Sequence, residues 1–203
     1  MEKEKTDQIV EKPSKKGTNK VSAAKSAAYI ASCVALLSVC AWITIPLPPP
    51  FVQFTLQTFA VFFAVILLGE WRSILALTAY VLLGLIGLPV FSGFNAAPAL
   101  FGPTGGYIFG FFFIPACVFI FKTIFGGEDG KLFATIVGCA VGLLVCYAFG
   151  TAWFIFIYTR LNGAVTIFAA LSWCVFPYVL PDGIKLALAI LLARRVKKLI
   201  RLY

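Results

Sequence analysis

Long apolar stretches separated by short polar breaks fill most of this chain. An α-helix needs about 20 mainly apolar residues to cross a bilayer core, and several of these stretches approach that length. We therefore predict six crossings, at about 24–45, 54–69, 73–88, 105–125, 132–157 and 181–198. Proline and glycine clusters end them, notably the proline-rich segment 46–50 after the first.

The segment 166–180 is also apolar, but it contains Pro177 and is followed by Pro181. Counting it as a crossing would give seven and would place the two chain ends on opposite sides of the membrane. We instead predict that it forms a short helix on the outer side of the bundle. The resulting fold class is an all-α integral membrane protein, a bundle of six transmembrane helices.

The distribution of charge predicts that both termini are cytoplasmic. Of the 17 Lys and Arg residues, twelve flank the first and last crossings: Lys3, Lys5, Lys12, Lys15, Lys16, Lys20, Lys25, Arg194, Arg195, Lys197, Lys198 and Arg201. Cations beside membrane spans stay on the cytoplasmic side, and termini on one side require an even number of crossings. This clustering favours contact with anionic lipid over nucleic-acid binding, despite the net charge of +9.

Composition supports a single membrane domain preceded by a tail. Hydrophobic residues make up 61% of the chain and charged residues only 12%, too few charges for a water-soluble domain of this size. Residues 1–23 are polar and lack an apolar periodicity, so we predict a disordered cytoplasmic tail rather than a cleavable signal peptide. Residues 24–203 form the membrane domain.

Several kinds of chemistry are disfavoured. The chain has no histidine, and its six cysteines lie at irregular spacings in apolar stretches, so we expect no metal site, disulfide framework or bound cofactor. The nucleotide-binding pattern G-x-x-x-x-G-K-[ST] is absent. Gly102, Gly106 and Gly110 recur every four residues, which is typical of close helix packing. We predict no catalytic residues and no enzyme activity.

Asp182 and Lys185 are the most informative polar residues. They begin the last predicted crossing, and a spacing of three places them on one helix face. Ionisable groups at membrane depth usually face the protein interior or a wet cavity. The alternative is an interfacial ion pair, with Asp182 also capping the helix and Lys185 extending outward. A ligand role requires other polar groups to converge on the same place.

Other groups on the predicted outer side could join this pair. Asn95 lies in a long loop between the third and fourth crossings, and its amide both donates and accepts hydrogen bonds. Gln57 begins the second crossing, where a role as a helix cap or interhelical contact is the alternative. On the first crossing, Ala27, Ala31 and Ala35 form a smooth strip, suited either to internal packing or to docking another subunit.

These features resemble the BioY family, the biotin-specific S components of energy-coupling factor (ECF) transporters. The resemblance covers about residues 24–198. It is carried by the segments Ile45-Pro46, Phe54-Thr55-Leu56-Gln57-Thr58, Leu83-Gly84-Leu85-Ile86-Gly87-Leu88-Pro89-Val90-Phe91, Gly102-Pro103-Thr104-Gly105-Gly106-Tyr107 and Leu180-Pro181-Asp182-Gly183-Ile184-Lys185.

The resemblance implies six helices, a multi-pass plasma-membrane location, and biotin bound near the outer surface. It implies that Asn95, Asp182 and Lys185 bind the substrate. Asp182 suits the ureido N–H groups of biotin, and Lys185 suits either its carbonyl or its carboxylate. We add Gln57 and, among the aromatic residues that could pack the ligand, Tyr147. The other aromatic candidates are Phe54, Tyr107, Trp153 and Tyr178.

The resemblance also implies partners. The family's alanine motif, matched here by Ala27, Ala31 and Ala35, contacts the transmembrane coupling subunit, and separate ATPase subunits supply the energy. Two other functions stay open: an S component for another vitamin, and a membrane enzyme that uses Asp182 as an acid or base. The enzyme lacks a second outer carboxylate or a histidine to partner Asp182.

Overall fold

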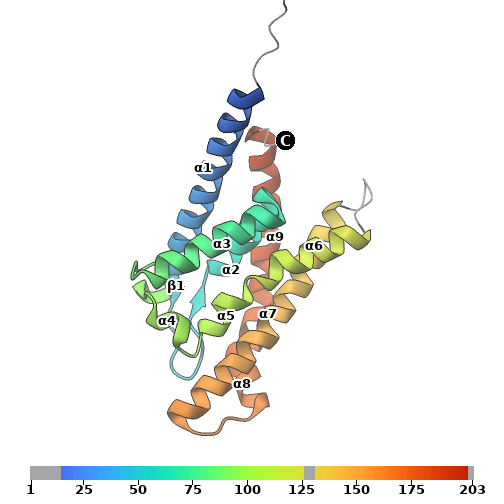
Figure 1. Cartoon of the computed structure of the whole chain (residues 1–203). Helices are drawn as coiled ribbons and strands as arrows, with labels where there is room; N and C mark the ends of the chain where they lie inside the picture. Colours follow the sequence, from blue (N-terminus) through green and yellow to red (C-terminus); the bar gives the residue numbers. More distant parts are fainter. Residues whose placement is uncertain (1–14, 126–130, 201–203) are drawn as a thin grey trace, which may run out of the picture.

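The computed structural model describes residues 15–125 and 131–200, which form a helical bundle with one short β-ribbon (Figure 1). The elements in chain order are α1 (Lys15–Trp42), β1 (Thr44–Ile45), β2 (Phe54–Thr55), α2 (Gln57–Leu68), α3 (Glu70–Leu85), the 3-10 turn η1 (Ser92–Phe94), α4 (Pro98–Phe101), α5 (Gly105–Gly110), α6 (Phe113–Phe125), α7 (Lys131–Asn162), α8 (Ile167–Cys174) and α9 (Phe176–Ile200).

Four helical stretches in the described part of the chain are long and apolar enough to cross a membrane. They are Ala23–Trp42, Gly105–Phe125, Lys131–Asn162 and Ile167–Leu199. The helices α2 and α3 have 12 and 16 residues, or about 18 and 24 Å at 1.5 Å per residue, shorter than a bilayer core. The count of six crossings therefore stays a prediction. The beginning of α1 and the end of α9 lie at the same end of the bundle (Figure 1).

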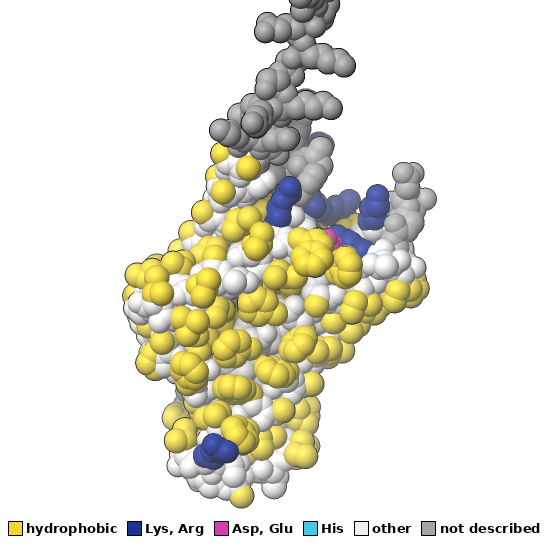
Figure 2. Space-filling view, viewed as in Figure 1, with side chains coloured by type: hydrophobic (Ala, Val, Ile, Leu, Met, Phe, Trp, Pro, Cys, Tyr) yellow, Lys and Arg dark blue, Asp and Glu magenta, His cyan; other side chains and the backbone are white. Residues whose placement is uncertain are grey.

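The surface fits a membrane environment. In Figure 2, hydrophobic side chains cover the middle of the visible face, and Lys and Arg side chains gather mainly at the end where α9 finishes. The described residues expose large apolar side chains on several helices, such as Leu75, Ile120, Leu144 and Leu191. Apolar exposure of this extent is typical of a surface that contacts lipid rather than water.

Two predicted boundaries were wrong. The helix α1 begins at Lys15, so residues 15–23 are helical rather than disordered, and residues 1–14 lie outside the described part. The segment 166–180 is not one outer helix: α8 ends at Cys174, and α9 begins at Phe176 rather than at Pro181. Pro177 lies in the first turn of α9, where a backbone N–H has no helical partner, so proline is tolerated there.

The fourth predicted crossing is divided into α5 and α6. At the junction, the N–H groups of Phe112 and Ile114 donate to carbonyls three residues back, at Phe109 and Phe111. This tighter turn separates the two helices, and Pro115 in the first turn of α6 is compatible with a new helix start.

Glycine lets α5, α6 and α7 approach closely. A Cβ on Gly142 would lie 2.6 Å from the Ile114 Cα, and one on Gly138 would lie 2.6 Å from the Val118 Cα. The predicted packing role of the α5 glycines is confirmed for Gly106 and Gly110, where an added Cβ would meet Trp153 and Cys146. Gly102 has no such close helix neighbour. This seam holds α7 against α6 and so positions the α7 side chains of the site.

The β-ribbon joins the end of α1 to the beginning of α2. Thr44 pairs with Thr55, and Ile45 pairs with Phe54, in an antiparallel register. The Leu56 N–H also donates to the Ile43 carbonyl at 3.3 Å. These bonds place the backbone of Thr55 beside the first turn of α2, where it reaches α9.

Candidate functional site

A cavity of about 570 Å³ opens among the loops at the end of the bundle away from the described termini. Its walls come from the loop segments 47–53 and 91–104, the first turn of α2, and the helices α5, α7, α8 and α9. Small-molecule sites typically have about 300–1,000 Å³. The cavity therefore has the size expected for a vitamin-sized ligand.

Asp182 and Lys185 lie side by side in the wall of this cavity. Their Oδ1 and Nζ atoms are 2.7 Å apart, and the two residues are only 3% and 5% exposed. The prediction that Asp182 and Lys185 share one helix face and point to the interior is confirmed. The alternative, in which Lys185 extends outward, is wrong because its ammonium is buried and bonded to interior oxygen atoms.

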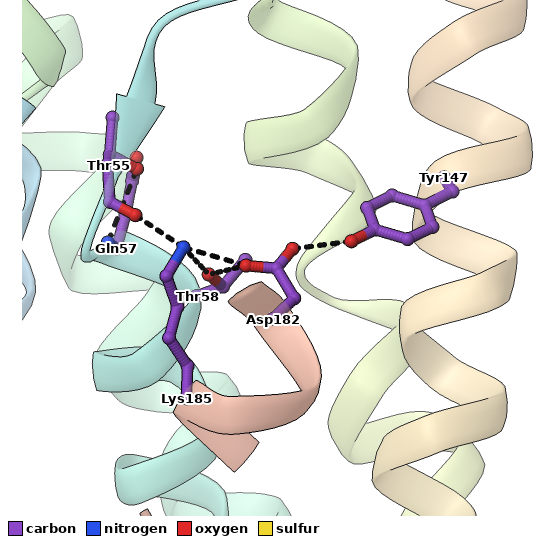
Figure 3. Close-up of polar contacts among 6 residues, drawn as sticks. All are labelled: Thr55, Gln57, Thr58, Tyr147, Asp182 and Lys185. Carbon is purple, nitrogen blue, oxygen red and sulfur yellow. Dashed lines mark hydrogen bonds and ion pairs between the residues drawn. The ribbon is translucent and has the colours of Figure 1, made fainter. Parts of the chain in front are cut away.

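Lys185 is held by three oxygen atoms (Figure 3). Besides Asp182, its Nζ donates to the Thr55 carbonyl at 2.6 Å and to the Thr58 Oγ1 at 3.1 Å. It also lies 4.1 Å from the centre of the Phe54 ring, within the range of a cation–π contact. All three N–H donors of the ammonium thus have acceptors.

The carboxylate of Asp182 is held by two further donors (Figure 3). Thr58 donates to Oδ1 at 2.8 Å, and Tyr147 donates to Oδ2 at 2.5 Å. Thr58 comes from α2 and Tyr147 from α7, so this carboxylate joins α9 to both helices. Because Oδ2 can accept more than one hydrogen bond, it can still receive an N–H from a ligand.

Gln57 lines the same cavity and is 5% exposed. Its Nε2 donates to the Tyr80 hydroxyl at 2.8 Å, and that hydroxyl donates to the Val90 carbonyl at 2.9 Å. This chain fixes the orientation of the amide and ties α2 to α3 and to the loop that follows it. The Gln57 amide bonds to Tyr80 rather than to the Asp182–Lys185 pair, so it contributes a separate polar group to the wall.

Asn95 lines the cavity at its exposed rim, away from the buried pair. Its Nδ2 donates to the Ser92 carbonyl at 2.9 Å, and the Ser92 hydroxyl donates to the Gln53 Oε1 at 2.8 Å. The second bond links the loops 47–53 and 91–104. Asn95, Asp182 and Lys185 therefore line one cavity, as predicted. The Asn95 amide bonds to the Ser92 carbonyl and not to the charged pair.

The aromatic candidates divide into two groups. Tyr107, Tyr147 and Tyr178 line the cavity. Phe54 packs on Lys185 instead, and the Trp153 indole lies outside the lining, donating to the Gly102 carbonyl at 3.0 Å.

Sequence reasoning missed two contributors, the Thr55 carbonyl and the Tyr80 hydroxyl. A backbone carbonyl carries no sequence signal. Tyr80 does carry one, because it is a polar group inside an apolar crossing and such groups usually have an interior partner.

Ala27, Ala31 and Ala35 are exposed along α1. On the same helix Cys33, Val34 and Leu37 are buried in the core. The alanine strip therefore faces away from the described part of the bundle, which excludes the alternative that it packs against the helices described here.

Comparison with known proteins decides the family. The family model described as "BioY family" matches residues 12–202, nearly the whole chain. The chain belongs to the BioY family. The resemblance found in the sequence is thereby confirmed.

Individual members of the BioY family are similar in sequence to this chain over most of their length. The Thermotoga maritima protein named "Biotin transporter BioY" is 44% identical over 168 residues, which cover 81% of this chain and 91% of the relative. A Pyrococcus horikoshii protein named "Probable biotin transporter BioY" is 37% identical over 175 residues, 86% of this chain and 97% of the relative.

A solved structure shows the same fold. The crystal structure of the S-component for biotin from an ECF-type ABC transporter superposes with a TM-score of 0.73 at 26% identity, covering 89% of this chain and 93% of that chain. The mainly helical membrane bundle predicted for this BioY chain is thus the fold of an ECF S component.

Proposed function

We propose that this protein is the biotin-binding membrane subunit of an ECF-type uptake system. The observation that carries the proposal is the buried Asp182–Lys185 pair in the wall of a vitamin-sized cavity. Membership of the BioY family, whose relatives are named biotin transporters, supports it.

The chemistry of the cavity suits a ureido ring. The Asp182 carboxylate can accept from a ureido N–H, and the Lys185 ammonium can donate to the ureido carbonyl in exchange for one of its present acceptors. The Tyr107, Tyr147 and Tyr178 rings supply apolar surface for the thioether ring and the chain. A ligand that lacked one of these groups would leave a buried partner unpaired, which is the basis of strong discrimination.

Energy for uptake would come from other subunits. The chain lacks the P-loop nucleotide-binding pattern, and the similar solved structure is an S-component of an ECF-type ABC transporter. We therefore propose a transport subunit rather than an enzyme, located in the plasma membrane with cytoplasmic termini. ATPase subunits and a membrane coupling subunit would be its partners.

The test is competition binding to the purified protein with biotin, thiamine and riboflavin. We expect biotin alone to displace labelled biotin at stoichiometric concentrations. Direct binding of labelled thiamine or labelled riboflavin, with no binding of labelled biotin, would instead identify an S component for another vitamin. Failure of all three to bind would reject the vitamin-binding function.

The alanine strip is the proposed docking surface for the coupling subunit. Replacing Ala31 by Trp would place a bulky ring on a face that must approach another helix closely. We expect Ala31→Trp to lose co-purification with the coupling subunit and ATP-dependent uptake, while biotin binding is kept. The measurements are pull-down from membranes and uptake into proteoliposomes.

Ala140 provides the matched control, because it is an exposed alanine on α7, away from the strip. Ala140→Trp should assemble and transport normally. Normal assembly of Ala31→Trp would show that this face of α1 is not the docking surface.

A further inference from the structure

The ring of Tyr107 lies against a position of α7 that has no side chain. Tyr107 lines the cavity, and Gly150 lies behind it, outside the lining. A Cβ built on Gly150 would lie 2.3 Å from Cδ1 and 2.4 Å from Cε1 of the Tyr107 ring. Only glycine allows a ring to approach a helix backbone so closely. The Tyr107 ring therefore fills the layer between the α7 backbone and the cavity.

Hydrogen bonds hold Tyr107 in this place at both of its ends. Its hydroxyl oxygen lies 2.9 Å from the Thr151 Oγ1, and its backbone carbonyl accepts from the Cys146 Sγ at 3.6 Å. Both partners belong to α7, on the same side as Gly150. Because the hydroxyl and the backbone of Tyr107 are both bonded to α7, the ring is kept in one orientation.

The helix α5, which carries Tyr107, is itself packed closely on α7. A Cβ on Gly106 would lie 2.3 Å from the Trp153 Cβ, and the Trp153 indole donates to the Gly102 carbonyl at 3.0 Å. Turning one side chain is easier than separating two close-packed helices. Volume added at Gly150 is therefore expected to turn the Tyr107 ring away from α7 and into the cavity.

The Tyr107 ring lies one helical turn outward from the buried pair. Tyr147, which donates to Asp182, precedes Gly150 by three residues of α7, or about 4.5 Å at 1.5 Å per residue. The same helix ends at Asn162, which is exposed and lines the cavity. If the ureido ring of biotin meets Asp182, the thioether ring fused to it lies at the level of Tyr107.

We propose that Gly150 is a positioning residue for substrate selection. Because Gly150 has no side chain, the Tyr107 ring stays back against α7 and leaves the cavity wide enough for the thioether ring of biotin. Gly150 does not touch the ligand and acts only through Tyr107. This inference rests on the proposed function, because it concerns which ligands the same cavity accepts.

The experiment compares two ligands on Gly150→Ala and on the wild-type protein. Calorimetric titration measures the affinity for biotin and for desthiobiotin, which lacks the sulfur atom and therefore has no thioether ring. In Gly150→Ala the affinity for biotin relative to desthiobiotin should fall by about tenfold, the scale on which an apolar pocket distinguishes ligands that differ by about one methylene. An unchanged ratio in the folded variant overturns the inference and leaves the proposed function standing. Absence of biotin binding to the wild-type protein rejects the proposed function, and this inference with it.

Gly138→Ala is the matched control, because it adds the same group to the same helix away from the cavity. A Cβ on Gly138 would lie 2.6 Å from the Val118 Cα, and both residues are outside the cavity lining. This variant should lose stability but keep the wild-type ratio of the two affinities. An equal shift of the ratio in Gly138→Ala would show that loosening of α7, and not the Tyr107 ring, changes selection.

Removing the ring gives a second test. In a Tyr107→Leu background, Gly150→Ala should no longer change the ratio of the two affinities, because the ring that it displaces is gone. The same double variant decides the case if Gly150→Ala alone does not fold, since Tyr107→Leu removes the overlap and should restore thermal unfolding at a measurable temperature in detergent. A double variant that fails to fold, or that still shows the shift in ratio, overturns the inference.

Discussion

Replacing Asp182 by Asn, or Lys185 by Met, is expected to weaken biotin binding by at least about 100-fold. Each change removes one proposed ligand contact and leaves the other buried charge without its partner at 2.7 Å. A buried contact left unpaired against the ligand costs about 1–3 kcal/mol of binding free energy, and more when the group is charged, and a factor of ten in affinity corresponds to about 1.4 kcal/mol. Calorimetric titration of biotin into each purified variant measures the effect.

A second ion pair in the same chain provides the matched control. Lys122 of α6 contacts Glu70 of α3, outside the cavity lining. Glu70→Gln and Lys122→Met remove a carboxylate and an ammonium, as the two site variants do. Because this pair lies outside the cavity lining, both control variants should leave the affinity for biotin unchanged. Near wild-type affinity in Asp182→Asn and Lys185→Met would remove this pair from the binding site.

The double variant Asp182→Asn/Lys185→Met separates binding from folding. Its site has no unpaired charge, so its thermal stability should recover relative to the single variants. Its affinity for biotin should stay low if the two side chains touch the ligand. Recovery of affinity together with stability would show that the pair only supports the fold.

Replacing Gly142 by Ala is expected to destabilise the bundle, and adding Gly138→Ala to destabilise it further. At each position the new Cβ would lie 2.6 Å from a backbone Cα of α6, a contact that cannot be relieved by rotating a side chain. Overpacking of this kind typically costs about 1–3 kcal/mol. Thermal unfolding in detergent measures it. Biotin affinity should fall as well, because α7 carries Tyr147.

Gly183→Ala is the control for this change. It lies in α9, and a Cβ there would meet nothing within 4 Å. Because Ala has the higher helix propensity by up to about 1 kcal/mol, the unfolding temperature should stay the same or rise. A Gly142→Ala protein that is as stable as Gly183→Ala would contradict the close α6–α7 seam.

Local sequence signals were sufficient for much of this protein. Apolar runs of sufficient length predicted helices in the right places, and a spacing of three correctly put Asp182 and Lys185 on one face. The spacing of four placed Ala27, Ala31 and Ala35 on one face of α1, and that face is exposed. These features depend only on helix period and on the cost of burying charge, which act within a few residues of one another.

The boundary of α9 shows where such signals fail. Proline is usually read as a helix end, yet Pro177 lies in the first turn of α9 and Pro181 lies inside it. Without the structure, a proline that begins a helix and one that ends it look the same. The break between α8 and α9 falls instead at Val175, whose backbone is not helical.

Thus the sequence alone determined the helical membrane class and the BioY family, and it predicted the residue types of the candidate site. Only the tertiary structure decided which atoms meet. The bonds of Asp182 to Thr58 and Tyr147 span 124 and 35 residues of chain, and Asn95 proved to be at the rim rather than on the pair. The physical reason is that helix period is a local property, whereas contacts between helices depend on how glycine seams and loops set the packing of distant segments.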